Sequence, residues 1–152
     1  MVRAAIALGS NLGDRQAVMQ DAVAQLARHL GELSVSDFLE TEPEGVGAQP
    51  RFLNAAAVGS WDGGARPLLD LLMGIEQSAG RERPYSGAPR TLDLDLILLG
   101  PAVINEAGLV VPHPRFRERG FVLAPLSQIA PDLIDPVTGL TMAELYGSWR
   151  AR

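Results

Sequence analysis

The sequence contains no cysteine and no lysine, and each absence excludes a class of chemistry. Without cysteine there is no disulfide, no thiolate metal ligand and no cysteine nucleophile, which fits a reducing compartment. Without lysine there is no P-loop lysine and no Schiff-base catalyst, so all 13 basic residues are arginines. No apolar run approaches the ~20 residues of a membrane-spanning helix, and no secretory signal is evident. We therefore expect a cytoplasmic protein with no membrane contact.

The length and the charge of the chain indicate the number of domains and the kind of ligand. The 152 residues suffice for one domain with a substantial core, so we expect a single domain over 1–152. The net charge of −5 argues against a nucleic-acid partner. Residues 81–119 nevertheless hold six arginines against five acids, whereas residues 1–80 hold five against ten. Such a cluster suits an anion such as phosphate, although a solvated loop surface explains it equally well.

The hydrophobic pattern predicts alternating strands and helices. Strands are expected at 2–8, 33–41, 52–61 and 91–99, and helices at 14–30, between Asp14 as N-cap and Gly31 as stop, and from Pro67 to Gly80. Loops are expected at 42–50 and 81–90, short strands near 102–111, a turn at 112–114, and helices near 117–124 and 141–147. The order predicts an α+β, ferredoxin-like β-α-β-β-α-β core with a C-terminal extension: an antiparallel sheet with two helices on one face.

Two carboxylates in the strand TLDLDLILL are the first chemical signal. Asp93 and Asp95 would share one face of the strand because side chains alternate, whereas Leu92, Leu94 and Leu96 would point into the core. Mg²⁺ prefers one or two carboxylates together with substrate phosphates, and such a pair can also bridge two ions. A solvated acidic strand face is the alternative. The arginine-rich segment beside the strand favours metal and phosphate.

Two further groups of residues extend this hypothesis of a metal and phosphate site. Arg81, Arg83 and Arg90 lie on a glycine- and proline-rich segment that runs into the acidic strand, and they could neutralise a phosphate chain. His113, held between two prolines, could donate to a phosphate oxygen, although an ordinary turn residue is an equal alternative. His29, near the end of the first helix, is assigned no function.

An aromatic and amide set suggests a site for a flat heterocycle. Asn54 lies in an apolar strand, where it needs hydrogen-bond partners and could bind the edge of a ring. Phe52 and Phe121 could stack on the ring faces, although core packing is the commoner role of phenylalanine. The GSNLGD segment at 9–14 lacks a P-loop ending, and we interpret it as a structural turn.

Taken together, these motifs resemble the 6-hydroxymethyl-7,8-dihydropterin pyrophosphokinase family of folate biosynthesis. The similarity runs from about residue 4 to 135. It is carried by ALGSNLGD at 7–14, TEPEG at 41–45, FLNAA at 52–56, IE at 75–76 before GRER at 80–83, APRTLDLD at 88–95, VPHPR at 111–115 and RGFVLAPL at 119–126. The resemblance implies a ferredoxin-like fold and transfer of pyrophosphate from ATP to the pterin hydroxymethyl group, with release of AMP.

The resemblance also implies roles for individual residues. Two Mg²⁺ ions would be held by Asp93 and Asp95, which count as catalytic together with Arg81 and Arg90. ATP would be bound by Arg81, Arg83, Arg90, Leu96, His113, Arg119 and Glu76. The pterin would be bound by Thr41, Pro43, Glu44, Phe52, Asn54 and Phe121. A monomer is expected, with mobile segments closing over both substrates.

Three departures from well-known family members stand beside these matches. Met73 replaces a glutamine near ATP, Gly87 and Ala88 replace a Trp-Gly pair, and Phe52 replaces a tyrosine. Two other classes of protein stay open at this point. A metal-dependent hydrolase or nucleotidyl transferase would use the same aspartates without a pterin, and the fold also serves non-catalytic ligand sensors.

Overall fold

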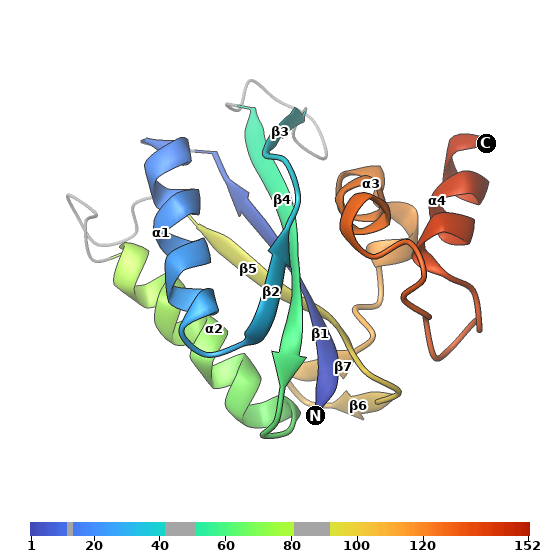
Figure 1. Cartoon of the computed structure of the whole chain (residues 1–152), viewed down its shortest axis with the longest axis horizontal. Helices are drawn as coiled ribbons and strands as arrows, with labels where there is room; N and C mark the ends of the chain where they lie inside the picture. The colour runs from blue at the N-terminus through green and yellow to red at the C-terminus, as the bar shows by residue number, and fades with distance from the viewer. Residues whose placement is uncertain (12–13, 42–50, 81–91) are drawn as a thin grey trace.

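The computed structural model describes residues 1–11, 14–41, 51–80 and 92–152, and an antiparallel sheet forms its centre (Figure 1). The strands are β1 (Val2–Ser10), β2 (Gly31–Val35), β3 (Leu39–Thr41), β4 (Phe52–Trp61) and β5 (Asp93–Leu99). Their order is β2-β4-β1-β5, with β3 also paired to β4, and every pairing is antiparallel. The predicted ferredoxin-like topology is confirmed.

Two helices, α1 (Arg15–Ala27) and α2 (Ala65–Gly80), cover one face of the sheet (Figure 1). Asp14 caps α1 as predicted, because its side chain accepts from the Ala17 N–H at 3.1 Å. The predicted end of this helix is wrong. It stops at Ala27, and Gly31 begins β2. Residues 28–30 still bond back to Gln25 and Leu26, so the helical pattern extends beyond the helix while Leu30 turns into the core.

The C-terminal third of the chain covers the opposite face of the sheet. It contributes the 3-10 turn η1 (Phe116–Glu118) and the helices α3 (Gly120–Ile129) and α4 (Met142–Arg150). The helix predicted near 117–124 is therefore a short turn followed by a longer helix, because Arg119 is extended and separates them. Both faces of the sheet are buried, with one core under α1 and α2 and a second core under α3 and α4.

The predicted strand 33–41 is two strands, interrupted at residues 36–38. Ser36 is buried there, and its hydroxyl accepts from the Ala56 N–H at 2.8 Å. Asp37 exchanges two hydrogen bonds with Gln128 of α3, at 3.1 and 2.8 Å. The interruption fixes β3 against both β4 and α3. The predicted loops at 42–50 and 81–90 lie outside the described residues.

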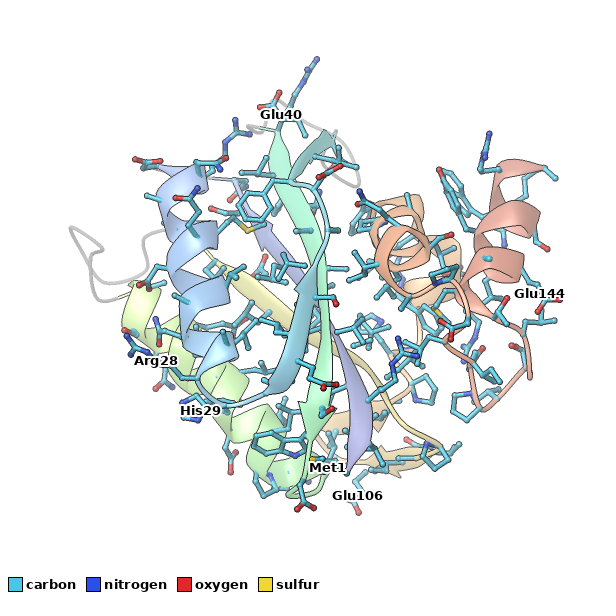
Figure 2. All side chains as sticks on the ribbon, viewed as in Figure 1. Met1, Arg28, His29, Glu40, Glu106 and Glu144 are labelled. Atoms are coloured by element: carbon cyan, nitrogen blue, oxygen red, sulfur yellow. The ribbon has the colours of Figure 1, made fainter. Side chains whose placement is uncertain are left out.

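The remaining elements form one edge of the molecule. The short strands expected near 102–111 are β6 (Ile104–Glu106) and β7 (Leu109–Val111), which pair as a hairpin with Gly108 at a φ of +77° in its turn. Figure 2 shows Met1 and Glu106 together at this end of the molecule and Glu40 at the opposite end. Within the described ranges, no helix has the length and apolar character needed to cross a membrane.

Candidate active site

A cavity of about 280 Å³ opens on the α3 side of the sheet, away from α1 and α2. Its described lining combines two carboxylates, an amide, a guanidinium group and two phenyl rings. The residues are Ala7, Leu8, Gly9, Thr41, Phe52, Asn54, Asp93, Asp95, Arg119, Phe121 and Val122. Seven of the predicted site residues are thus brought together from four elements and the residue before α3.

Strand register explains how the sheet assembles this site. Asp93 lies opposite Gly9, which lies opposite Asn54 on its other side. Thr41 lies opposite Phe52 at the end of the same sheet. Residues that are directly opposite in an antiparallel pair point to the same face, so one row of residues carries acidic, small and amide side chains in turn. Thr41 and Phe52 form the next row on the same face, two residues along β4 from Asn54.

The two aspartates point into the cavity because β5 keeps strict alternation at its start. Asp93 and Asp95 are exposed, whereas Leu94 and Leu96 are 5% and 6% exposed and pack into the first core, as predicted. Ile97 is an extra residue opposite β1, since Ala5 pairs with Leu98 and Ile6 with Leu96. This bulge lets the strand carry carboxylates into the cavity and then bury apolar residues on both faces.

The carboxylate pair has the chemistry of a magnesium site completed by a ligand. Among the described residues, no group of three or more His, Asp or Glu side chains could hold a metal ion. Mg²⁺ is usually bound through one or two carboxylates plus substrate phosphates and waters, so two aspartates at a cavity mouth fit that ion. The residues present therefore suit Mg²⁺ brought with a phosphate ligand better than a closed structural site.

Glu76 supports this strand from behind and does not line the cavity. Its Oε2 accepts from the backbone N–H of Leu94 at 2.7 Å, between the two aspartates. The bond joins α2 to the start of β5. The structure thus places Glu76 as a residue that positions the acidic strand.

Asn54 is a buried amide whose orientation is fixed by β3. Its Nδ2 donates to the hydroxyl of Thr41, and only 6% of the residue is exposed. The Oδ1 atom lies beside Gly9, where a Cβ added to the glycine would stand 3.1 Å from it and 3.5 Å from Phe52 Cδ1. Because glycine has no side chain, the floor of the cavity leaves room at this amide.

Arg119 and Phe121 form the opposite wall, at the start of α3. The Arg119 guanidinium carbon lies 5.6 Å from the centre of the Phe121 ring, which is a cation–π distance. The wall thus presents a positive charge and an aromatic face to the same cavity, across from Asn54 and Phe52. A flat, polar heterocycle joined to an anion would meet matching groups here.

His113 and Leu96 are not among the residues that line this cavity. The His113 N–H donates to Ile97 O at 2.9 Å, and its Nδ1 accepts from the Arg115 N–H at 3.1 Å. The neutral imidazole therefore carries its proton on Nε2, which can donate to a phosphate. Leu96 has its side chain in the first core. Figure 2 shows His29 beside Arg28 at the far end of α1, in keeping with no assigned role.

An ion pair fixes the rim of the site near β3. Arg15, the first residue of α1, binds Glu40 of β3 and donates to Arg51 O at 2.8 Å. The hydrogen bond and the charge of Arg15 hold the pKa of the Glu40 carboxyl below its usual value. Arg81, Arg83, Arg90, Pro43 and Glu44 lie outside the described residues, as do Gly87 and Ala88. Their predicted roles stay predictions.

Four lining residues were not anticipated from the sequence: Ala7, Leu8, Gly9 and Val122. For the lining residues of the first strand, the sequence did contain a signal. Alternate positions Ala5, Ala7 and Gly9 carry only small side chains, and these face the cavity side of the sheet. A strand face without bulk in an otherwise apolar strand leaves room for a ligand or another backbone.

Comparison with known proteins identifies the family to which the chain belongs. Residues 5–131 match the family model described as 7,8-dihydro-6-hydroxymethylpterin-pyrophosphokinase. The chain is 44% identical to the Bacillus subtilis 2-amino-4-hydroxy-6-hydroxymethyldihydropteridine pyrophosphokinase over 126 residues, covering 82% of this chain and 75% of that protein. It is 39% identical to the enzyme of the same name from Methylorubrum extorquens over 146 residues, covering 95% and 91%.

Some relatives are much longer than this chain. The Pneumocystis carinii "Folic acid synthesis protein fol1" is 39% identical over 142 residues, which are 93% of this chain and 19% of that protein. Among solved structures, wild-type Plasmodium falciparum HPPK-DHPS superposes with a TM-score of 0.77 over 99% of this chain and 45% of that one, at 14% identity. That likeness supports the fold alone. By the family match over 5–131 and the near-complete bacterial alignment, the chain belongs to the 7,8-dihydro-6-hydroxymethylpterin-pyrophosphokinase family.

Proposed function

We propose that this pyrophosphokinase of folate biosynthesis transfers pyrophosphate from ATP to the hydroxymethyl group of 6-hydroxymethyl-7,8-dihydropterin and releases AMP. The reaction class follows from the family. The observation that carries the residue assignment is one cavity lined by a carboxylate pair and, across Gly9, by an amide, with two phenyl rings in the same lining. A hydrolase acting on polynucleotides would have no use for the second half of that cavity.

In this proposal the pterin lies between Phe52 and Phe121 with its edge on Asn54. Thr41 accepts one proton of the Asn54 amide, which leaves the carbonyl oxygen of that amide directed at the ligand. An amide donor and acceptor in a nearly buried site distinguish ring edges strongly, because an unmatched ligand leaves them unpaired. Phe52 in place of tyrosine keeps the stacking face.

Asp93 and Asp95 would hold Mg²⁺, and we propose two ions bound together with ATP. The metal supplies charge neutralisation along the triphosphate when it is bound. The protein's side chains contribute by positioning the phosphates. Arg119 contributes positive charge at the cavity wall, and His113 Nε2 donates to a phosphate oxygen. Arg81, Arg83 and Arg90 belong to the same proposal as further phosphate ligands, with Leu96 beside the nucleotide and Glu76 holding the strand.

The transfer itself needs little covalent help from the protein. The pterin hydroxyl oxygen forms a bond to the β-phosphorus while the bond from that phosphorus to the α,β-bridging oxygen breaks. AMP leaves with the bridging oxygen, and the hydroxyl proton passes to solvent. Alignment of the two substrates and neutralisation of charge account for most of the acceleration.

The test is the nucleotide product. We expect purified protein with ATP and Mg²⁺ to release AMP only when 6-hydroxymethyl-7,8-dihydropterin is present. Release of ADP would indicate a simple kinase or phosphatase. A lack of any pterin-dependent turnover would leave a ligand-sensing module as the better explanation.

Gly9 offers a direct test of the pterin end of the cavity. We expect Gly9→Ala to raise the pterin KM about tenfold, since a misplacement of a few tenths of an ångström near a bound ring is costly. The added Cβ would press on Asn54 Oδ1 at 3.1 Å. Steady-state kinetics with each substrate varied in turn measures this effect.

A matched glycine provides the control for that experiment. Gly74 lies in α2, and a Cβ added there would meet nothing within 4 Å. Gly74→Ala should leave the pterin KM unchanged and add about 1 kcal/mol of helix stability. Equal pterin KM values for both variants would contradict the place given to Gly9.

The organisation and setting of the protein are part of the same proposal. We propose one domain over 1–152, because both faces of a single continuous sheet are covered by helices from the two halves of the chain. We also propose a monomer in the cytoplasm, for which the cysteine-free composition is suited. Size-exclusion chromatography with light scattering would measure the oligomeric state.

A further inference from the structure

The wall that carries Arg119 and Phe121 is joined to the C-terminal helix by Trp149. The indole Nε1–H of Trp149 donates to Glu118 O at 3.3 Å. Its ring lies directly on Gly120, where an added Cβ would stand 2.7 Å from Cζ3 and closer still to two other ring carbons. The indole therefore touches the backbone on both sides of Arg119.

A second cavity, of about 540 Å³, adjoins this wall. Its described lining includes Phe121, Tyr146 and Trp149, and it shares Thr41, Asn54, Arg119 and Phe121 with the first cavity. Phe121 borders both cavities and packs against the second core. Because close packing is what fixes an aromatic ring, the position of this wall depends on the contacts of the segment that carries it.

Two further contacts hold the indole and the turn in place. Tyr146, one turn earlier on α4, stacks on Trp149 with ring centres 6.2 Å apart and an interplanar angle of 17°. Arg117 of η1 makes a two-point ion pair with the buried Asp135, at 2.6 and 2.9 Å. Residues 116–121 are thus held by later parts of the chain at both ends, by Asp135 at Arg117 and by Trp149 at Gly120.

We propose that Trp149 is a positioning residue for the transfer reaction. Its contacts with Glu118 and Gly120 set the position of the Arg119–Phe121 wall and hence the affinity for the pterin ring. This inference rests on the proposed function. The family match ends at residue 131, so the chain uses a residue outside the matched part to shape its substrate site.

Three variants test the proposal by steady-state kinetics. Trp149→Ala should raise the pterin KM about tenfold and the ATP KM several-fold with kcat within about threefold, because Phe121 and Arg119 move together. Trp149→Phe keeps a ring over Gly120 and should recover most of the pterin affinity. The control is Leu145→Ala, which removes a buried side chain of the same helix and should lower stability without changing the pterin KM.

A readout without turnover accompanies the kinetics. The chain has two tryptophans, and the other, Trp61, donates its indole N–H to Gly64 O at 2.7 Å. Trp61 lies at the end of β4 and does not line either cavity. In an NMR spectrum with two indole N–H signals, saturating pterin should shift the signal of Trp149 and leave that of Trp61 in place.

The outcomes separate the two proposals. A wild-type chain without pterin-dependent AMP release would overturn the proposed function and this inference together. An active wild-type chain whose Trp149→Ala variant shows no greater rise in pterin KM than Leu145→Ala would overturn this inference alone, as would an unmoved Trp149 signal. A rise specific to Trp149→Ala, recovered by Trp149→Phe, would support it.

Discussion

We expect Asp95→Ala to lower pterin-dependent AMP release about 10³-fold, a loss of roughly 4 kcal/mol of transition-state stabilisation. Asp95 is exposed in the cavity beside Asp93 and lies opposite Ala7, so no neighbouring side chain on β1 can replace its carboxylate. The fold should survive, because the side chain belongs to neither core. Single-turnover measurement of AMP at saturating ATP and pterin gives the effect on the chemical step.

A second carboxylate serves as the control for that experiment. Asp70 is exposed on α2, and Asp70→Ala removes the same charge from a position that does not line the cavity. It should turn over like the wild type. Raising Mg²⁺ should restore part of the activity of Asp95→Asn, which keeps an oxygen ligand. If Asp95→Ala retained wild-type turnover, the metal role of the acidic strand would have to be abandoned.

The largest effect on stability is expected from Asp135, at the centre of the C-terminal segment. Asp135 is fully buried and accepts from Arg117, from the Thr138 hydroxyl at 2.7 Å and from the Val137 N–H at 3.0 Å. Removing one partner of a buried ion pair leaves the other uncompensated. We therefore expect Asp135→Asn to lower the free energy of unfolding by about 3 kcal/mol at neutral pH, or roughly 6–12 °C in Tm.

The pH dependence of this loss follows from the direction of the pKa shift. Burial raises the pKa of the Asp135 carboxyl, but the hydrogen bonds from Arg117, Thr138 and Val137 outweigh it and hold the pKa below the ordinary value of 3.8. The stabilisation is then fully present above that value and is lost as the pH falls through the lower folded pKa. Urea unfolding of wild type and variant should give a constant difference from about pH 8 to pH 5, which shrinks below pH 4.

Asp132 is the matched control for the acid titration. It is an exposed carboxylate on the same segment, and its ion pair with Arg3 is long, at 3.8 Å. Asp132→Asn should change the unfolding free energy by less than about 0.5 kcal/mol at any pH. A pH-independent difference for Asp135→Asn would mean that packing, and not ionisation, makes the residue important.

The acidic strand could be predicted because its information is local. A period of two along TLDLDLILL places Asp93 and Asp95 on one face and the leucines on the other, whatever the strand pairs with. The first and fourth strands could be predicted as short, nearly continuous apolar runs, and both covering helices from apolar residues spaced at i, i+3 and i+4. The break at 36–38 was missed because the tertiary contacts of Ser36 and Asp37, with Ala56 and Gln128, interrupt a stretch that alternates well.

In the candidate site, too, some features could be predicted from the sequence and others depended on tertiary contacts. The residue types for a metal, a phosphate chain and a flat ring were visible along the chain, and the resemblance supplied their roles. The place of Gly9 in the cavity floor was not visible, because it depends on which residues face it across β4 and β5. Nor was the role of Trp149, which touches a backbone segment some 30 residues away, at Glu118.

Local pattern and residue chemistry thus indicate most of the strands and helices, and they mark the side chains that we propose for metal and heterocycle. Tertiary packing decides which of those side chains share one cavity, where β5 bulges, and how the C-terminal helix supports the wall at Arg119 and Phe121. The reason is physical. Periodicity and side-chain chemistry are properties of neighbouring residues, whereas register, close approach at a glycine and burial of an ion pair arise only when distant segments meet.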